Sequence, residues 1–342
     1  MTLSWNEMNL AKQQENQSNL LDKIISPIKS SLDQMESRFK EYVVSENPVI
    51  QEMIDYVFAK KGKRLRPALV FISASINQDS KSQNIIDLAL CIELIHIATL
   101  VHDDVNDKSD LRRGIETYNK KWGSTASVLF GDFLFARAFV ILSQLGNLTI
   151  IQNLSKTTSE ICEGEIMQNF LKTDYEITID QYSQIIRYKT ASLIAESCRI
   201  GAIITDQSVK VQDALYRFGL NLGMAFQIYD DYLDFKGDQS KLGKPVLNDI
   251  MNGYITLPMI HLFNQFSNGE REKVYELIEK DRKANNLDHI KSLLKEYQCL
   301  EYSLNMANDY IYKAIDILDD MENDELRQSL RQVANFIIQR DY

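Results

Sequence analysis

The chain has 342 residues, of which 44% are hydrophobic and 25% charged, a balance typical of a globular protein with a sizeable core. Its 38 basic and 48 acidic residues give a net charge of −10, which disfavours a nucleic-acid-binding protein, because that class usually carries a basic surface. Only 13 glycines and 5 prolines interrupt the chain, so long helices are favoured over a sandwich of short strands.

In chain order, residues 1–18 are polar and rich in Gln and Asn, and we expect a flexible arm there. From residue 19 to residue 342 the pattern is helical almost throughout, with no apparent linker, so one large all-α domain is predicted. The clearest predicted helices cover residues 20–39, 84–104, 125–145, 216–235 and 290–318. Predicted loops lie at 75–83, 106–123, 172–180, 236–253 and 264–272.

A short acidic motif, DD-x-x-D, occurs twice, each time at the end of a strongly apolar predicted helix. Its copies are Asp103, Asp104 and Asp107, and then Asp230, Asp231 and Asp234. Residues three and four positions apart share a helical face, so each copy presents a cluster of carboxylates. One cluster alone is most simply a solvated helix end, but two that face each other across a cavity repel unless cations join them. Oxygen ligands without His or Cys suit Mg²⁺, which commonly completes its shell with substrate phosphates, so a diphosphate or triphosphate ligand is predicted.

Basic residues that could bind such a phosphate are concentrated at two places in this acidic chain. The stretch KKGKRLRP covers residues 60–67, and Arg112 and Arg113 follow the first acidic motif. Arginine and lysine bind phosphate through charge-assisted hydrogen bonds, although KKGKR by itself could equally be a solvated basic face. Neither G-x-x-x-x-G-K-[ST] nor G-x-G-x-x-G is present, so an ordinary nucleotide site is not supported.

Together these motifs resemble those of the trans-isoprenyl diphosphate synthases, in the family's own order. The matching landmarks are GKRLRP (62–67), ELIHIATLVHDDVND (93–107), LRRG (111–114), GDFLFARAF (131–139), KT (189–190), QIYDDYLDF (227–235) and LGKP (242–245). They span roughly residues 20 to 340, nearly the whole chain. The resemblance implies the isoprenoid synthase fold, a single large helical bundle around a central cavity.

The resemblance also implies roles for individual residues. Both acidic motifs would bind Mg²⁺, about three ions with substrate present, with Asp230 the usual ligand of the second motif. The residues that would grip the allylic diphosphate are Arg112, Lys189 and Lys244. Those that would bind isopentenyl diphosphate are Lys63, Arg66, His96 and Arg113. Thr190 and Gln227 would lie near the reacting carbons, together with Lys189. For His96 the alternative is a hydrogen-bonded core histidine.

Product length should depend on the residues just before the first acidic motif. Short-chain members of the family tend to place an aromatic residue there, whereas this chain has Ala98 and Thr99. The motif DDVND also lacks the two-residue insertion of many farnesyl-forming enzymes. Both features favour a long-chain product, with heptaprenyl as our estimate, although a blockage deeper in the channel would give a shorter one. One departure from the family pattern is Tyr254, which stands where many members have a lysine.

The implied activity is a Mg²⁺-dependent prenyltransferase that builds a long-chain all-trans polyprenyl diphosphate, a precursor of quinone side chains. A farnesyl or geranylgeranyl diphosphate synthase is the closest alternative. A non-catalytic regulatory subunit is disfavoured because both acidic motifs are intact, and a terpene cyclase would not need the second motif. The expected partner is a second copy of the chain or a small regulatory subunit, with transient membrane contact when product leaves.

We also expect a cytoplasmic location. The N-terminal sequence shows no signal peptide, and no uninterrupted run of 18 apolar residues predicts a membrane span. The four cysteines form no C-x-x-C pair and stand in apolar contexts, which predicts buried free thiols in a reducing compartment.

Overall fold

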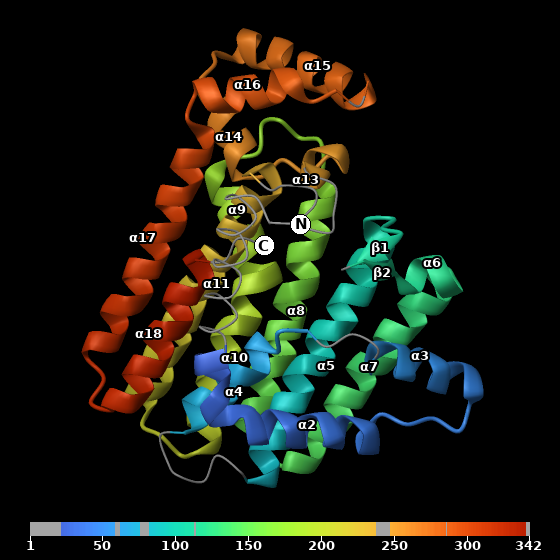
Figure 1. The fold of residues 1–342 in the computed structure, drawn as a ribbon, viewed down its shortest axis with the longest axis vertical. Helices are drawn as coiled ribbons and strands as arrows, with labels where there is room; N and C mark the ends of the chain where they lie inside the picture. Colours follow the sequence, from blue (N-terminus) through green and yellow to red (C-terminus); the bar gives the residue numbers. More distant parts are fainter. Residues whose placement is uncertain are drawn as a thin grey trace, which may run out of the picture.

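The computed structural model describes residues 22–58, 62–75, 82–112, 114–236, 247–284 and 286–339. Long helices run side by side along the molecule, with shorter helices at its two ends (Figure 1). After a 3₁₀ turn, η1 (Ser26–Ile28), the first half contains α2 (Lys29–Tyr42), α3 (Pro48–Phe58), α4 (Leu65–Ala74), α5 (Gln83–Asn106), α6 (Tyr118–Trp122), α7 (Ser124–Leu145) and α8 (Leu148–Phe170). The second half contains α9 (Ile179–Ile186), the π-helical turn η2 (Arg187–Ala191), α10 (Ser192–Ile204), α11 (Val209–Lys236), α13 (Asn248–Met251), α14 (Leu257–Phe263), α15 (Asn268–Ala284), α16 (Asp288–Glu296), α17 (Cys299–Asp319) and α18 (Asp324–Gln339).

Helix α5 is the centre of the bundle. Its sequence is apolar on all sides, so it is stable only when other helices surround it. It packs against α2, α4, α7 and α10, and side chains such as Leu88, Leu90 and Leu94 are fully buried. The end of α5 that carries the first acidic motif lies beside a small hairpin formed by β1 (Leu111–Arg112) and β2 (Ile115–Glu116) (Figure 1).

The predicted all-α class is confirmed. The predicted helices at 84–104, 125–145 and 216–235 correspond to α5, α7 and α11. The prediction of a single helix at 290–318 is wrong, because the helix is interrupted between α16 and α17. Gln298 adopts a left-handed backbone conformation there, with φ 52°, which an α-helix cannot contain. The amphipathic pattern continues through the break, so periodicity alone did not reveal it.

The predicted loop at 106–123 contains a two-stranded antiparallel hairpin and a short helix. Strand β1 (Leu111–Arg112) pairs with β2 (Ile115–Glu116), with Arg112 opposite Ile115. Thr117 then caps α6, because its hydroxyl accepts the Lys120 backbone N–H at 3.1 Å and donates to the Ser109 carbonyl at 2.6 Å. The hairpin therefore ties Arg112 to the end of α5.

Two helices, α5 and α7, are long and apolar enough to cross a membrane, although no uninterrupted apolar run predicted one. Of the most apolar window of α5, 78% is buried, as expected for the core helix of a bundle, whereas only 39% of that of α7 is buried. Among the cysteines, Cys162 is exposed, so the prediction of a buried thiol is wrong there, while the other three are buried and free. The predicted arm, 1–18, lies outside the described residues, and the domain division stays a prediction.

Candidate active site

One cavity of about 750 Å³ opens between α5, α8, η2 and α11. The predicted site residues on its wall are Lys63, Arg66, His96, Thr99, Asp103, Asp104, Asp107, Arg112, Lys189, Thr190, Gln227, Asp230, Asp231 and Asp234. Ala98 is fully buried and is not part of this wall. Arg113 and Lys244 lie outside the described residues. The two acidic motifs, 127 positions apart, therefore meet at one cavity as the sequence predicted.

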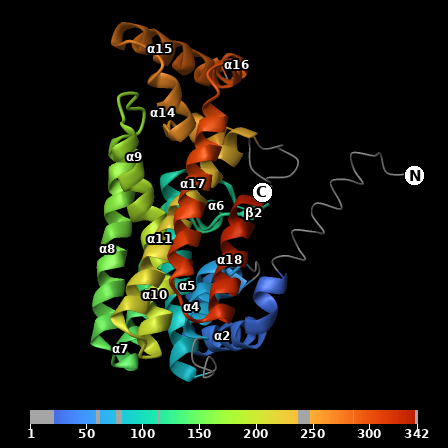
Figure 2. The ribbon, with the colours of Figure 1, turned by 90° about the vertical axis from the view of Figure 1, so that its left-hand side faces the viewer.

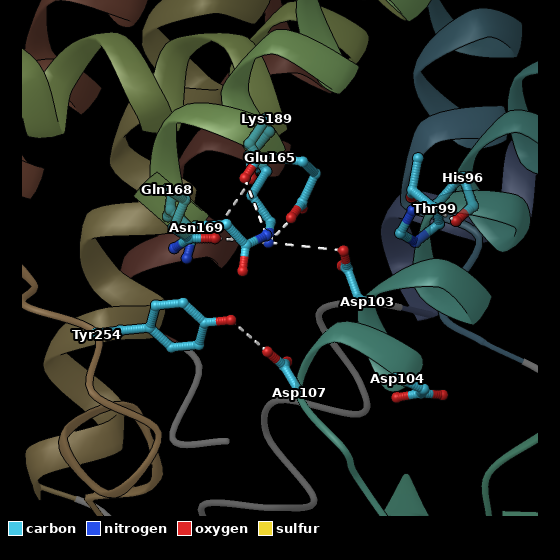
Figure 3. Close-up of polar contacts among 12 residues, drawn as sticks. His96, Thr99, Asp103, Asp104, Asp107, Glu165, Gln168, Asn169, Lys189 and Tyr254 are labelled. Carbon is cyan, nitrogen blue, oxygen red and sulfur yellow. Dashed lines mark hydrogen bonds and ion pairs between the residues drawn. The ribbon is translucent and has the colours of Figure 1, made fainter. Parts of the chain in front are cut away.

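The three aspartates of the first motif have different surroundings. Asp104 is buried and accepts a hydrogen bond from Nε of Arg112 at 2.7 Å, so a cation of the protein already neutralises it. Asp103 and Asp107 are half-buried on the cavity wall, one turn apart near the end of α5. Asp107 accepts a 2.6 Å hydrogen bond from the hydroxyl of Tyr254, which comes from the loop before α14 (Figure 3).

In the second motif, Asp231 and Asp234 accept hydrogen bonds that fix their carboxylates. Asp231 is buried and accepts hydrogen bonds from the Tyr182 hydroxyl at 2.6 Å and from Nε2 of Gln227 at 2.8 Å. Burial raises the pKa of Asp231 to about 7, despite these two donors. The carboxylate of Asp234 accepts the backbone N–H groups of residues 248 and 249 at 3.2 and 3.1 Å, at the start of α13. Asp230 lies on the cavity wall beside them.

Lys189 lies in the π-helical turn η2, an irregularity that is common at functional sites. Its ammonium donates to Oε1 of Gln168 at 2.8 Å, forms an ion pair with Glu165, and lies 3.6 Å from Oδ1 of Asp103 across the cavity (Figure 3). Glu165 and Gln168 are almost one turn apart on α8, so both side chains contact the ammonium of Lys189 from the same face of that helix. Burial, opposed by Lys189 and reinforced by Asp103, raises the pKa of Glu165 to about 8.

A glycine lets α8 approach η2 closely enough for these contacts. A Cβ at Gly164 would lie 2.7 Å from the backbone nitrogen of Lys189, closer than real Cβ contacts allow. Any larger residue at 164 would therefore displace the turn that carries Lys189.

A hydrogen-bonded chain connects the residues predicted near the reacting carbons. The Thr190 hydroxyl donates to Oε1 of Gln227 at 2.8 Å, and the amide of Gln227 donates in turn to Asp231. Tyr182 donates to the same carboxylate of Asp231, so this chain of hydrogen bonds fixes the orientations of the Thr190 and Gln227 side chains. Thr190 and Gln227 both line the cavity.

A second basic group lines the cavity at the start of α4. Nη1 of Arg66 lies 3.1 Å from Nε2 of His96 on α5, and the ammonium of Lys63 lies 5.8 Å from the ring centre of Phe336 on α18. His96 lines the cavity, but its contact with Arg66 also fits the alternative of a hydrogen-bonded histidine, so its role in diphosphate binding stays a prediction. The side chains of Lys63, Arg66 and His96 come from two elements, the start of α4 and helix α5.

Several cavity residues were missed by sequence reasoning. Glu165, Gln168 and Tyr182 all contact predicted site residues. Glu165 and Gln168 are three positions apart, which is a helical-face signal, but neither has a basic or acidic repeat around it to make it conspicuous. Tyr182 stands in an ordinary amphipathic pattern, and its role depends on a carboxylate 49 positions away.

The donor set of the cavity fits Mg²⁺. It consists of carboxylate oxygens, and Oδ1 of Asp103 and Oε1 of Glu165 are buried without a well-formed hydrogen bond although an ammonium lies near them. Within the described residues, no three acidic, His or Cys side chains form a ready-made metal site. Mg²⁺ commonly takes one or two carboxylates and completes its shell with substrate phosphates, so an incomplete protein cage is what that ion requires.

Comparison with known proteins agrees with this geometry. Residues 47–297 match the family model for polyprenyl synthetase. The chain is 36% identical to heptaprenyl diphosphate synthase component 2 of Geobacillus stearothermophilus, over 94% of this chain and 99% of that protein. The structure resembles that of a decaprenyl diphosphate synthase from Rhodobacter capsulatus, with a TM-score of 0.87, 32% identity, and coverage of 94% of this chain and 99% of that one.

A third similar protein is a polyprenyl synthase from Caulobacter crescentus CB15, solved in complex with calcium and isoprenyl diphosphate. Its TM-score is 0.87, with 31% identity over 94% of this chain and 98% of that one. The predicted all-α isoprenoid synthase fold and the predicted activity, a trans-prenyltransferase of the long-chain type, are confirmed by these comparisons. The chain belongs to the polyprenyl synthetase family.

Proposed function

We propose that this enzyme elongates an allylic diphosphate with isopentenyl diphosphate and releases an all-trans product of about seven isoprene units, the low part of the long-chain range. The observation that carries the proposal is one cavity lined by two carboxylate clusters, by Lys189 and Arg112, and by a second basic group, Lys63, Arg66 and His96. Two diphosphates of different substrates need two such groups.

The allylic diphosphate would bind between the acidic motifs. Asp103, Asp107 and Asp230 are the carboxylates we assign to Mg²⁺, because the family resemblance gives the metal to the outer carboxylates of the first motif and to the first aspartate of the second, and all three line the cavity. When bound, Mg²⁺ supplies positive charge that stabilises the leaving diphosphate. Lys189 and Arg112 add fixed cationic donors at the same place, so the carbon–oxygen bond can ionise without a side-chain nucleophile.

Isopentenyl diphosphate would bind to Lys63, Arg66 and His96, and to Arg113 by the family resemblance. This fixes its double bond near the allylic carbon, and the rate advantage comes from proximity and orientation. Oxygen atoms of Thr190 and Gln227 would face the carbocation and stabilise its charge. The proton lost from the condensed product is assigned to the released diphosphate, following the family resemblance.

The decisive assay combines purified protein, Mg²⁺, a geranyl or farnesyl primer and labelled isopentenyl diphosphate, with products resolved by chain length. A ladder that ends at long polyprenyl diphosphates is expected. Absence of elongation, both alone and with a cognate small subunit, would contradict the proposal. A ladder that stops at three or four isoprene units would instead identify a farnesyl or geranylgeranyl diphosphate synthase.

We further propose that α7 and α8 form a subunit interface. These helices lie along one edge of the bundle (Figure 2) and expose large apolar side chains, including Leu129 at 62%, Ile166 at 56% and Phe170 at 85% exposure. Apolar surface on this scale favours a protein contact over solvent. The relative from Geobacillus stearothermophilus is named component 2. That name supports a heterodimer with a small regulatory subunit as the alternative to a homodimer.

Light scattering on the purified protein would measure this assembly. A dimer is expected, or a monomer that pairs only with the small subunit, and Leu129→Asp should weaken either one. A stable monomer whose Leu129→Asp variant is fully active would contradict the interface. The cytoplasmic location, transient membrane contact and a role in quinone side-chain supply remain part of the same proposal.

A further inference from the structure

Arg64, between the two basic residues assigned to isopentenyl diphosphate, has an unusual backbone conformation. Its φ and ψ angles of 52° and 34° are left-handed, directly before the first residue of α4. Few residues other than glycine adopt this conformation, and it persists only where the surroundings enforce it. The contacts around Arg64 therefore have to stabilise this backbone conformation.

Two carboxylates from two other helices hold it. Nε of Arg64 donates to Oε1 of Glu36 on α2 at 2.8 Å, and Nη1 forms a short ion pair with Oε1 of Glu93 on α5. All three side chains are largely buried, with exposures of 10%, 18% and 5%. A planar guanidinium in such a fork fixes direction as well as distance.

This fork connects the two elements that make up the second basic group. Glu93 lies one turn before His96 on the same helix, and Arg66 follows Arg64 by two residues. The fork therefore sets how the start of α4 sits against α5, and Arg66 comes to lie 3.1 Å from His96. A shift of the fork would move both of the residues that meet there.

The charges indicate why Arg64 is not itself a phosphate ligand. Its guanidinium is shared between two buried carboxylates, so a diphosphate would have to displace one of them and leave it buried. We propose that Arg64, with Glu36 and Glu93, is a positioning device that fixes Lys63 and Arg66 against His96 to receive the diphosphate of isopentenyl diphosphate. This proposal rests on the function proposed above and adds three residues to it.

Glu36→Gln is the sharpest test, because Glu36 does not line the cavity and cannot touch a substrate. Loosening the fork should raise the KM for isopentenyl diphosphate about tenfold, since small displacements of a binding group are costly, and leave the KM for the primer within about twofold. Calorimetric titration with isopentenyl diphosphate should show the same loss of affinity. Glu41→Gln is the matched control, since Glu41 is on the same helix in a pair with Arg38 and is 60% exposed.

Glu93→Gln distinguishes positioning from direct binding. If Arg64 were a phosphate ligand restrained by Glu93, this change would release it and lower the KM for isopentenyl diphosphate. The positioning role predicts a raised KM instead, with partial rescue in Arg64→Lys relative to Arg64→Met. Should the Glu93 variant fail to fold, Glu36→Gln still decides between the two.

Three outcomes would overturn the proposal: an unchanged KM in Glu36→Gln, an equal rise for both substrates, or a lowered KM in Glu93→Gln. A wild-type protein that makes no product would contradict the proposed function instead.

Discussion

Thr99, rather than Ala98, is predicted to control how far the product chain extends. The sequence placed both residues beside the growing chain, and by that reasoning Ala98→Phe should shorten the product. In the structure Thr99 lines the cavity while Ala98 is fully buried outside its wall. Cys91 and His102, which share the face of Ala98 on α5, both contact α7, so Ala98 faces α7 as well.

The two substitutions should therefore differ in kind. A ring at Thr99 would occupy space that the product needs. One isoprene unit has five carbons, and at about 0.8 kcal/mol per buried CH₂ the loss of room for one unit removes about 4 kcal/mol of burial. A difference of about 4 kcal/mol corresponds to about a thousandfold in partition between extension and release. A ring at Ala98 would instead overpack the contact between α5 and α7, at about 1–3 kcal/mol of stability.

The assay is product length after dephosphorylation, measured beside the thermal unfolding temperature. Thr99→Phe should give shorter products with little change in unfolding, and Ala98→Phe should lower the unfolding temperature before it alters length. Thr99→Val, similar in size but without the hydroxyl that donates to the His96 carbonyl, is the control and should keep wild-type length. The reasoning would be refuted by shortened products from an equally stable Ala98→Phe protein and unchanged products from Thr99→Phe.

Three further predictions concern the rest of the cavity. Gly164→Ala should lower the free energy of unfolding in urea by about 1–3 kcal/mol and reduce activity, because the added Cβ would meet the backbone of η2. Wild-type stability and activity would show that η2 can shift to accommodate the Cβ. Tyr254→Phe removes the hydroxyl that donates to Asp107, so calorimetry should show weaker Mg²⁺-dependent binding of inorganic pyrophosphate. The control is Tyr302→Phe on α17, away from the cavity, which should bind pyrophosphate like the wild type. Equal binding by Tyr254→Phe and the wild type would contradict an orienting role for Tyr254. EDTA should abolish turnover but leave the helical circular dichroism unchanged, because the buried carboxylates of Asp104 and Asp231 already have donors within the protein; unfolding by EDTA would make the metal structural.

The parts of the fold that sequence could predict were those written in local patterns. The apolar helix α5 and the helix α11 ending in YDDYLDF were identified by composition and spacing over about 20 residues, which tertiary contacts cannot easily override. The break at Gln298 was not, because a left-handed residue at a helix boundary leaves hydrophobic spacing intact. The hairpin at Arg112 was also missed, since two-residue strands carry too few side chains to show alternation.

The candidate site, like the fold, could be predicted from the sequence only in part. Residue types and motif order predicted the acidic and basic groups, yet the sequence could not tell which partner within the protein each aspartate has. Asp104 and Asp103 are adjacent, but only the structure shows Arg112 bonded to the first and Lys189 near the second. Such assignments depend on partners 8 and 86 positions away, and no local rule encodes them.

The acidic clusters also require a different account of their charge than the sequence suggested. From sequence, clustered carboxylates near a buried helix were untenable without added cations. In the structure the protein supplies part of the compensation itself: Arg112, Lys189 and the hydroxyls of Tyr182 and Tyr254 each bond or face one of these carboxylates. The bundle can therefore fold before metal binds, and the compensation that is missing lies where the substrate diphosphate arrives. Under the proposed function, Mg²⁺ and diphosphate would complete a charge balance that the protein leaves open on the cavity side, and metal binding would then be coupled to substrate binding instead of to folding.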